Sequence, residues 1–174
     1  GAEKINEVAF ELMQVLNGHE GASMVFGTGK WYYDKIIEQA AERGIEIKDN
    51  IRIKDYIEDM ENYLAACDLV ISRAGALSVA ETTVCGKASV LIPSPNVTGN
   101  HQYYNAKAVA DRGGAVLMEE KDLTAEALIS QVMRLKNNPD QLAEMGRASR
   151  SCAPDRALDI IYSTIMEIIE KKVK

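Results

Sequence analysis

Cysteine and histidine are scarce in this sequence of 174 residues, which contains three cysteines and two histidines. Cys67, Cys85 and Cys152 are odd in number, widely spaced and without a C-x-x-C pair, so the sequence predicts reduced thiols rather than a disulfide framework. Apolar residues with helical spacing surround Cys67 and Cys85, and we expect both to be buried. The two histidines, His19 and His101, show no zinc-type spacing. We therefore expect neither a metal nor any other cofactor.

Long apolar runs are absent as well, and none approaches the roughly 18 residues that a membrane-spanning helix needs. The N-terminus lacks the basic-then-apolar pattern of a signal peptide, so the sequence predicts a soluble, cytoplasmic chain. Acidic residues outnumber basic ones, which gives a net charge of −6. Binding to a phosphate backbone needs a concentrated basic face, and we therefore expect no nucleic acid among the partners.

Three motifs that bind phosphate or metal are also missing. No Asp-x-Asp occurs, so no carboxylate pair of that kind is available to hold a metal against a diphosphate. The absence of a Walker loop and of a complete G-x-G-x-x-G argues against a kinase and a dehydrogenase. If this chain binds a diphosphate, N–H groups at a helix start, rather than a cation, should carry its charge.

Short apolar runs alternate with helix-like segments along the whole chain. Such runs are typical of strands that helices cover on both faces, as in a parallel sheet. The expected strands are 22–26, 50–56, 69–72, 88–93 and 115–118. The alternation predicts an α/β domain of three layers, with right-handed crossovers and a Rossmann-like, doubly wound parallel sheet of about five strands.

The segment 155–172, after a possible hinge at Ala153-Pro154, predicts the last helix. It carries one apolar stripe, which is formed by Ile160, Ile161, Ile165, Ile168 and Ile169. The expected role of this stripe is packing on the core. The alternative is that it docks on a neighbouring domain that is absent from this sequence.

The turn after the third expected strand is a candidate anion site. Gly75 has no Cβ, so a ligand can approach the main chain closely there. The helix that begins near Ala76 directs unpaired N–H groups and its positive dipole end at this turn. Two ordinary explanations stay open: Gly75 could relieve strain, and Ser78 could cap its own helix.

Glu81 follows Ser78 by about one helical turn, so both side chains can face the same crevice. Apolar neighbours surround it, and a half-buried carboxylate needs hydrogen-bond partners. A carboxylate can accept two hydrogen bonds from the vicinal hydroxyls of a ribose, as acidic residues do in dinucleotide-binding folds. The alternative is a solvated glutamate on a helix face.

A polar loop follows the fourth expected strand, and His101 and Gln102 open the next helix. Ligands of open parallel sheets lie beyond the carboxyl ends of the strands, so this loop and the Gly75 turn should line one crevice. Gln102 offers a donor and an acceptor to sugar hydroxyls. His101 could do the same, could titrate, or could simply cap its helix. Main-chain groups of Ile57, after the second strand, could pair with the edge of a flat base.

Several segments of this sequence resemble one family. They read S-R-A-G-A-L-S-V-A-E, G-K-A-S-V-L-I-P-S-P and N-H-Q-Y-Y-N-A, with G-A-E-K-I-N and Y-I-E-D-M in addition, and the match spans nearly the whole chain. They resemble the C-terminal domain of the MurG family, the bacterial N-acetylglucosaminyltransferases that convert lipid I to lipid II in peptidoglycan synthesis. The resemblance implies a GT-B enzyme of two facing Rossmann-like halves, in which 1–174 is the domain that binds UDP-N-acetylglucosamine.

The resemblance also implies contacts for individual residues. Glu81 would hold the ribose hydroxyls, and Leu77 and Ser78 would meet the diphosphate. Ala76 and Gln102 would contact the N-acetylglucosamine.

Ile57 would bind the uracil through its backbone, by the same resemblance. His101 stands where members of the family carry either His or Gln, which leaves its role open. Arg73 belongs to the family motif, but the sequence assigns no contact to it.

The sequence departs from the family pattern at its N-terminal side. The first strand of the domain, most of its Gly-rich loop and the whole acceptor domain are not in this sequence. Loss of that strand should expose two unpaired strand edges, so we expect pairing with another chain or a preceding segment. The general base should come from the missing half. We expect the fragment alone to be inactive, and the full-length protein to be peripheral to the inner face of the cell membrane.

Other functions stay open at this point. A chain of this kind could be the donor-binding subunit of a split transferase, which is not catalytic alone. It could instead be another UDP-sugar enzyme on the same fold, such as an epimerase. The plainest alternative is an α/β interaction module that binds no nucleotide.

Overall fold

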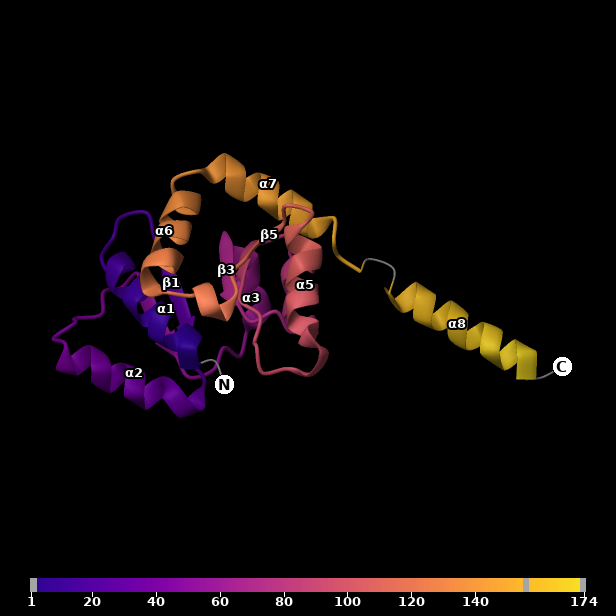
Figure 1. Cartoon of the computed structure of the whole chain (residues 1–174), viewed down its shortest axis with the longest axis horizontal. Helices are drawn as coiled ribbons and strands as arrows, with labels where there is room; N and C mark the ends of the chain where they lie inside the picture. The colour runs from indigo at the N-terminus through magenta and orange to yellow at the C-terminus, as the bar shows by residue number, and fades with distance from the viewer. Residues whose placement is uncertain (1–2, 155–156, 173–174) are drawn as a thin grey trace.

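The computed structural model describes residues 3–154 and 157–172, in which five short strands alternate with helices (Figure 1). The strands are β1 (Met24–Gly27), β2 (Ile51–Lys54), β3 (Leu69–Ser72), β4 (Ala88–Leu91) and β5 (Ala115–Leu117). The helices are α1 (Glu3–Leu16), α2 (Lys30–Glu42), α3 (Met60–Ala66), α4 (Ala76–Val84), α5 (His101–Ala110), α6 (Ala125–Lys136), α7 (Pro139–Arg150) and α8 (Ala157–Lys172), with the short 3-10 turns η1 (Thr98–Asn100) and η2 (Glu120–Asp122). These bounds confirm the α/β class and the predicted order of elements.

The strands form two parallel sheets rather than the single sheet that the sequence predicts. β1 pairs only with β2, and β3, β4 and β5 form the second sheet in that order. All pairings are parallel, as the sequence predicts. Within the described residues β1, β2, β3 and β5 each pair with one strand, and only β4 has a partner on both sides.

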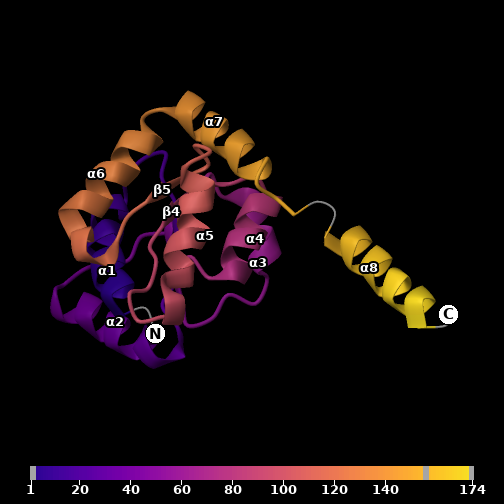
Figure 2. The ribbon, with the colours of Figure 1, turned by 45° about the vertical axis from the view of Figure 1, so that its right-hand side comes forward.

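One apolar core nevertheless joins the two sheets. Its largest fully buried side chains on α1 are Phe10, Leu12 and Met13, and α6 adds Leu128 and Leu135. These helices pack on residues of both sheets, while α4 and α5 cover the second sheet from another side with a smaller cluster (Figure 2). The helical layers on both faces are those that the alternating pattern predicts.

The last helix does not pack on this core. α8 projects away from the rest of the molecule in both views, and all of its described side chains are exposed (Figures 1 and 2). The stripe on Ile161, Ile165 and Ile168 is between 50% and 55% exposed. The expectation that it packs on the core is wrong for the described residues, because this stripe stays exposed. Residues 155–156 of the expected helix lie outside the described residues.

The cysteines are free, as predicted, but they are less buried than expected. Cys85 is exposed, because it follows the last residue of α4 at the surface, and Cys67 and Cys152 are half-buried. None of the helices in the described part of the chain is both long and apolar enough to cross a membrane.

Candidate functional site

The start of α4 presents main-chain donors at the end of β3. The first helical hydrogen bond of α4 runs from the Val79 N–H to the Gly75 carbonyl, at 3.0 Å. The N–H groups of Ala76, Leu77 and Ser78 come before this bond, so the helix itself offers them no acceptor. No side chain caps the helix, and Leu77 is 80% exposed. An anion in solution can therefore reach these three donors.

The backbone conformation at position 75 does not require a glycine. Its φ of −63° and ψ of 150° are ordinary for any residue. A Cβ added there would have as its nearest neighbour Ser78 Oγ, at 3.9 Å, which is an ordinary contact. The strain-relief explanation is thus unsupported, and close approach of a ligand at Gly75 stays a prediction. The Ser78 hydroxyl does not cap α4, so it is also available to a ligand.

Glu81 is exposed, contrary to the expectation of a half-buried carboxylate. Its carboxylate makes no hydrogen bond or ion pair with the described residues, although its main-chain carbonyl accepts from the Cys85 N–H at 3.0 Å. The apolar neighbours in the sequence, such as Val79 and Ala80, are only partly buried themselves, so α4 lies nearer the surface than the pattern indicates. Both carboxylate oxygens can accept hydrogen bonds from a ligand. Because they are exposed, the ligand must replace the water molecules that solvate them.

The loop after β4 holds Gln102 in place. Gln102 Oε1 accepts a hydrogen bond from the Ser94 N–H at 2.9 Å, which leaves the side-chain NH₂ group for other partners. His101 is exposed, and its Nδ1 lies 2.9 Å from the Thr98 carbonyl oxygen. The contact does not cap α5, because its partner is a carbonyl oxygen and the start of that helix has no side-chain cap.

Two further residues tie these loops together, and neither was assigned a contact from the sequence. Arg73 Nη1 donates to the carbonyls of Ile92 and Pro93, at 3.4 and 3.3 Å, and Nη2 forms an ion pair with Glu120. Asn105 Nδ2, on α5, donates to the Ala74 carbonyl at 3.1 Å.

The loops after β3, β4 and β5 are therefore cross-linked at one edge of the second sheet. The motif S-R-A-G-A marked Arg73, but its partners are far along the chain, so no local pattern could identify them.

Ile57 lies apart from this group, on the loop after β2 in the first sheet. It packs on the end of β1: a Cβ at Gly27 would lie 3.0 Å from Ile57 Cδ1. The packing explains a small residue at Gly27. No described contact brings Ile57 to the other candidate residues.

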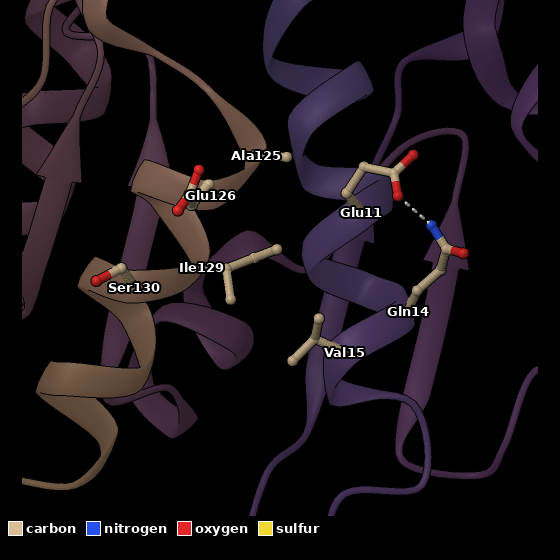
Figure 3. Close-up of a pocket in the computed structure, with 7 residues that line it drawn as sticks. All are labelled: Glu11, Gln14, Val15, Ala125, Glu126, Ile129 and Ser130. Atoms are coloured by element: carbon tan, nitrogen blue, oxygen red, sulfur yellow. Dashed lines mark hydrogen bonds between the residues drawn. The ribbon is translucent and has the colours of Figure 1, made fainter.

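Two cavities in the described part of the chain lie elsewhere. The larger, of about 650 Å³, lies between α1 and α6 and is lined by Glu11, Gln14, Val15, Ala125, Glu126, Ile129 and Ser130 (Figure 3). The second, of about 390 Å³, lies between α1 and α2. Neither includes a candidate residue. The candidate residues therefore line neither of these two cavities, and the start of α4 offers free main-chain donors instead.

Comparison with known proteins decides the family. Residues 1–160 match the model of the glycosyltransferase family 28 C-terminal domain. The chain belongs to this family. A protein of Clostridioides difficile (strain 630) is 38% identical over 174 residues, and one of Desulforudis audaxviator is 39% identical over 173 residues. Both are named UDP-N-acetylglucosamine–N-acetylmuramyl-(pentapeptide) pyrophosphoryl-undecaprenol N-acetylglucosamine transferase.

This chain is shorter than the proteins that it matches. All of it aligns with the C. difficile protein and 98% of it with the D. audaxviator protein, but it spans only 42% and 45% of their lengths. Among solved structures, MurG of Acinetobacter baumannii superimposes with a TM-score of 0.81 at 29% identity, over 96% of this chain and 47% of that one. The glycosyltransferase VinC, solved with DTDP, shares the fold at 21% identity and a TM-score of 0.69, over 97% of this chain and 40% of its own. The resemblance to the MurG family and the Rossmann-like half of a GT-B fold are confirmed.

Proposed function

We propose that this chain is the donor-binding domain of an inverting transferase that moves N-acetylglucosamine from UDP-N-acetylglucosamine to a lipid-linked muramyl-pentapeptide in peptidoglycan synthesis. The observation that carries the proposal is the family match over residues 1–160, together with relatives that bear this activity in their names. The free N–H groups at the start of α4 support it from the chemistry of the site. Through this reaction the protein would serve cell-wall biogenesis, cell shape and cell division.

The donor would lie along the edge that carries the loops after β3 and β4. The N–H groups of Leu77 and Ser78 receive the diphosphate, and Glu81 accepts hydrogen bonds from the ribose hydroxyls. Ala76 and the free NH₂ group of Gln102 contact the N-acetylglucosamine. Gly75 has no Cβ, which keeps the approach to these donors open.

Two candidate residues have more distant roles in this proposal. The backbone of Ile57 meets the uracil, and the packing of its side chain on Gly27 fixes that loop. The His101 ring has one nitrogen at the Thr98 carbonyl, so only its Nε2 is left to reach the donor sugar.

In the proposed reaction these residues contribute mainly by electrostatic stabilisation. The acceptor hydroxyl displaces UDP from the anomeric carbon in one step, and negative charge grows on the leaving diphosphate. Donors that already point at that position stabilise the charge without reorganising. The edge also holds the sugar in position for attack. No described residue at this edge is assigned as the general base, which belongs to a second domain, so this chain alone binds the donor and transfers nothing.

A second domain also accounts for two features that a single domain leaves without explanation. The candidate residues line neither cavity because the facing domain supplies the other wall of the cleft. The exposed stripe of α8 docks on that domain, where its isoleucines leave water. The complete protein works at the inner face of the cell membrane, where its lipid-linked acceptor is found.

Calorimetry of UDP-N-acetylglucosamine binding tests the proposal. Glu81→Gln should weaken binding by about 1.5–3 kcal/mol, the range for hydrogen bonds to a charged group, because the ribose loses its ionic acceptor. The matched control is Glu126→Gln, an exposed glutamate on α6 beside the larger cavity, which should leave the affinity unchanged. Equal affinities for wild type and Glu81→Gln would contradict the ribose assignment. Tighter binding of UDP-glucose than of UDP-N-acetylglucosamine would instead indicate another UDP-sugar enzyme.

A further inference from the structure

Cys67 and Cys85 lie at the amino ends of two neighbouring strands. Cys67 directly follows α3 and comes just before β3, and Cys85 directly follows α4 and comes just before β4. Because β3 and β4 pair in parallel, with Leu69 opposite Ala88, their amino ends meet at the same edge of the second sheet. The two cysteines are therefore neighbours in space, although the whole of β3 and α4 separates them in the chain.

The spacing of the strands suits a disulfide. Neighbouring strands are about 4.8 Å apart, and a disulfide joins Cα atoms that are about 4.4–6.8 Å apart. Cys67 stands two residues before Leu69, and Cys85 stands three residues before Ala88, so both have nearly the same level in the register. A bond between them would link the end of α3 to the end of α4.

The Lys87 side chain shows that the two segments touch. Its Nζ reaches from the residue before β4 to the end of α3, where it donates to the Ala65 carbonyl at 2.8 Å. Burial raises the pKa of the Cys67 thiol, the Lys87 ammonium lowers it, and charged neighbours that include Cys85 raise it further. Because the interaction between charges weakens with distance, Lys87 and Cys85 both lie near the Cys67 sulfur.

The exposure of the two thiols assigns them different roles. Cys85 is exposed, so a reagent in solution reaches it first. Cys67 is half-buried, and its Sγ donates to the Leu64 carbonyl at 3.5 Å, so it is reached mainly from within the protein. Cys152 packs against the smaller apolar cluster between α7 and α8, so the strand register gives it no place beside them.

From this geometry we infer that Cys67 and Cys85 form a thiol pair that closes to a reversible disulfide at the amino edge of the second sheet. The substrate class is a small disulfide, such as oxidised glutathione. The Cys85 thiolate attacks one sulfur of that disulfide, which releases one thiolate and leaves a mixed disulfide on Cys85. Cys67 then gives up its proton and attacks the Cys85 sulfur, which releases the second thiolate.

This sequence of steps balances. The protein loses two electrons and two protons as the bond between Cys67 and Cys85 forms. The small disulfide takes up both and leaves as two thiols. The inference is independent of the donor site.

Oxidised glutathione tests the inference on the chain as it stands. At about pH 8, where thiolates form readily, the wild-type chain should lose two hydrogens and keep no glutathione at Cys67 or Cys85. Peptide mass spectrometry without reduction should find these two residues joined, and dithiothreitol should free both. Cys67→Ser should stop at the mixed disulfide on Cys85. Loss of glutathione from Cys85 should be at least about tenfold faster in the wild type, since a neighbouring thiol acts at high effective concentration.

The matched control is Cys152→Ser, which should form the same bridge at the wild-type rate. The peptide map of the wild-type chain decides the question without relying on any variant. Glutathione that stays on Cys85 while Cys67 remains a free thiol would overturn the inference, because the two sulfurs would then be too far apart. A bridge from Cys85 to Cys152, or between two copies of the chain in dilute solution, would overturn it as well. So would a Cys85 thiol that stays free throughout.

Discussion

The guanidinium of Arg73, directly after β3, forms an ion pair with the carboxylate of Glu120, which opens the 3-10 turn η2 after β5. The two side chains are only 20% and 23% exposed. Arg73 also holds the last carbonyls of the β4 segment, so one side chain connects the carboxyl ends of all three strands of the second sheet. The Arg73 side chain thereby links the loops at the edge of the sheet that carries the candidate donor site.

Loss of this pair should destabilise the fold. Glu120→Ala leaves a half-buried guanidinium without its anion, and we expect the free energy of unfolding to fall by about 1.5–3 kcal/mol in urea denaturation. The control is Asp111→Ala, which removes the exposed pair of Lys107 and Asp111 on α5 and should cost about 0.3–0.5 kcal/mol. Equal losses for the two variants would mean that the Arg73 pair is no more than a surface contact.

Alanine should mainly affect ligand binding at Gly75 and mainly affect stability at Gly114. Gly75→Ala fits the backbone, so we expect a loss of stability of at most about 1 kcal/mol, the usual cost of alanine at a helix start. UDP binding should nevertheless weaken, because the added methyl group meets the ligand. Gly114→Ala would place a Cβ 2.6 Å from the backbone of Ser149 and should cost about 1–3 kcal/mol of stability through overpacking. Thermal unfolding and calorimetry on both variants check this, and unchanged UDP affinity of Gly75→Ala would contradict the close approach of a ligand.

Removal of α8 should leave the stability of the remainder unchanged. A chain that ends at Pro154 loses α8, whose described side chains are exposed, so its urea midpoint should match that of the full chain. Solubility should rise, because the exposed isoleucine stripe is gone. A midpoint that falls clearly on truncation would show that α8 packs on the core in solution.

The pH at which the Cys67 thiol becomes reactive should be higher in the folded protein than in the unfolded chain. Burial raises the pKa of the Cys67 thiol, and the nearby Lys87 ammonium opposes this effect only in part. The folded protein therefore keeps this thiol protonated to a higher pH than the unfolded chain does. Any stability that this group contributes is complete below the unfolded pKa and is lost as the pH rises through the folded pKa.

Alkylation followed by peptide mass spectrometry measures this effect. The rate at Cys67 in the folded protein should rise at a higher pH than the rate at the same residue in urea, because the thiolate is the reactive form. The exposed Cys85 should react faster than Cys67 in the folded protein. Identical pH profiles for folded and unfolded Cys67 would show that burial does not affect this thiol.

The sequence predicts the order of helices and strands well, because periodicity and turn residues are local signals. β3 begins and ends at its predicted bounds, 69 and 72. The exposure of Glu81 and the position of α8 could not be predicted, because both depend on what covers a helix face in three dimensions. The roles of Arg73 and Asn105 also needed the fold, since their partners are carbonyls and carboxylates that no pattern links to them.

The central claim is that the first N–H groups of α4 bind the donor diphosphate. An NMR titration of the ¹⁵N-labelled chain with UDP-N-acetylglucosamine tests it most directly. We predict that the amide signals of Ala76, Leu77 and Ser78, and the side-chain amide of Gln102, shift as the ligand is added. Signals that stay in place at α4 while those around the cavity between α1 and α6 move would contradict the account.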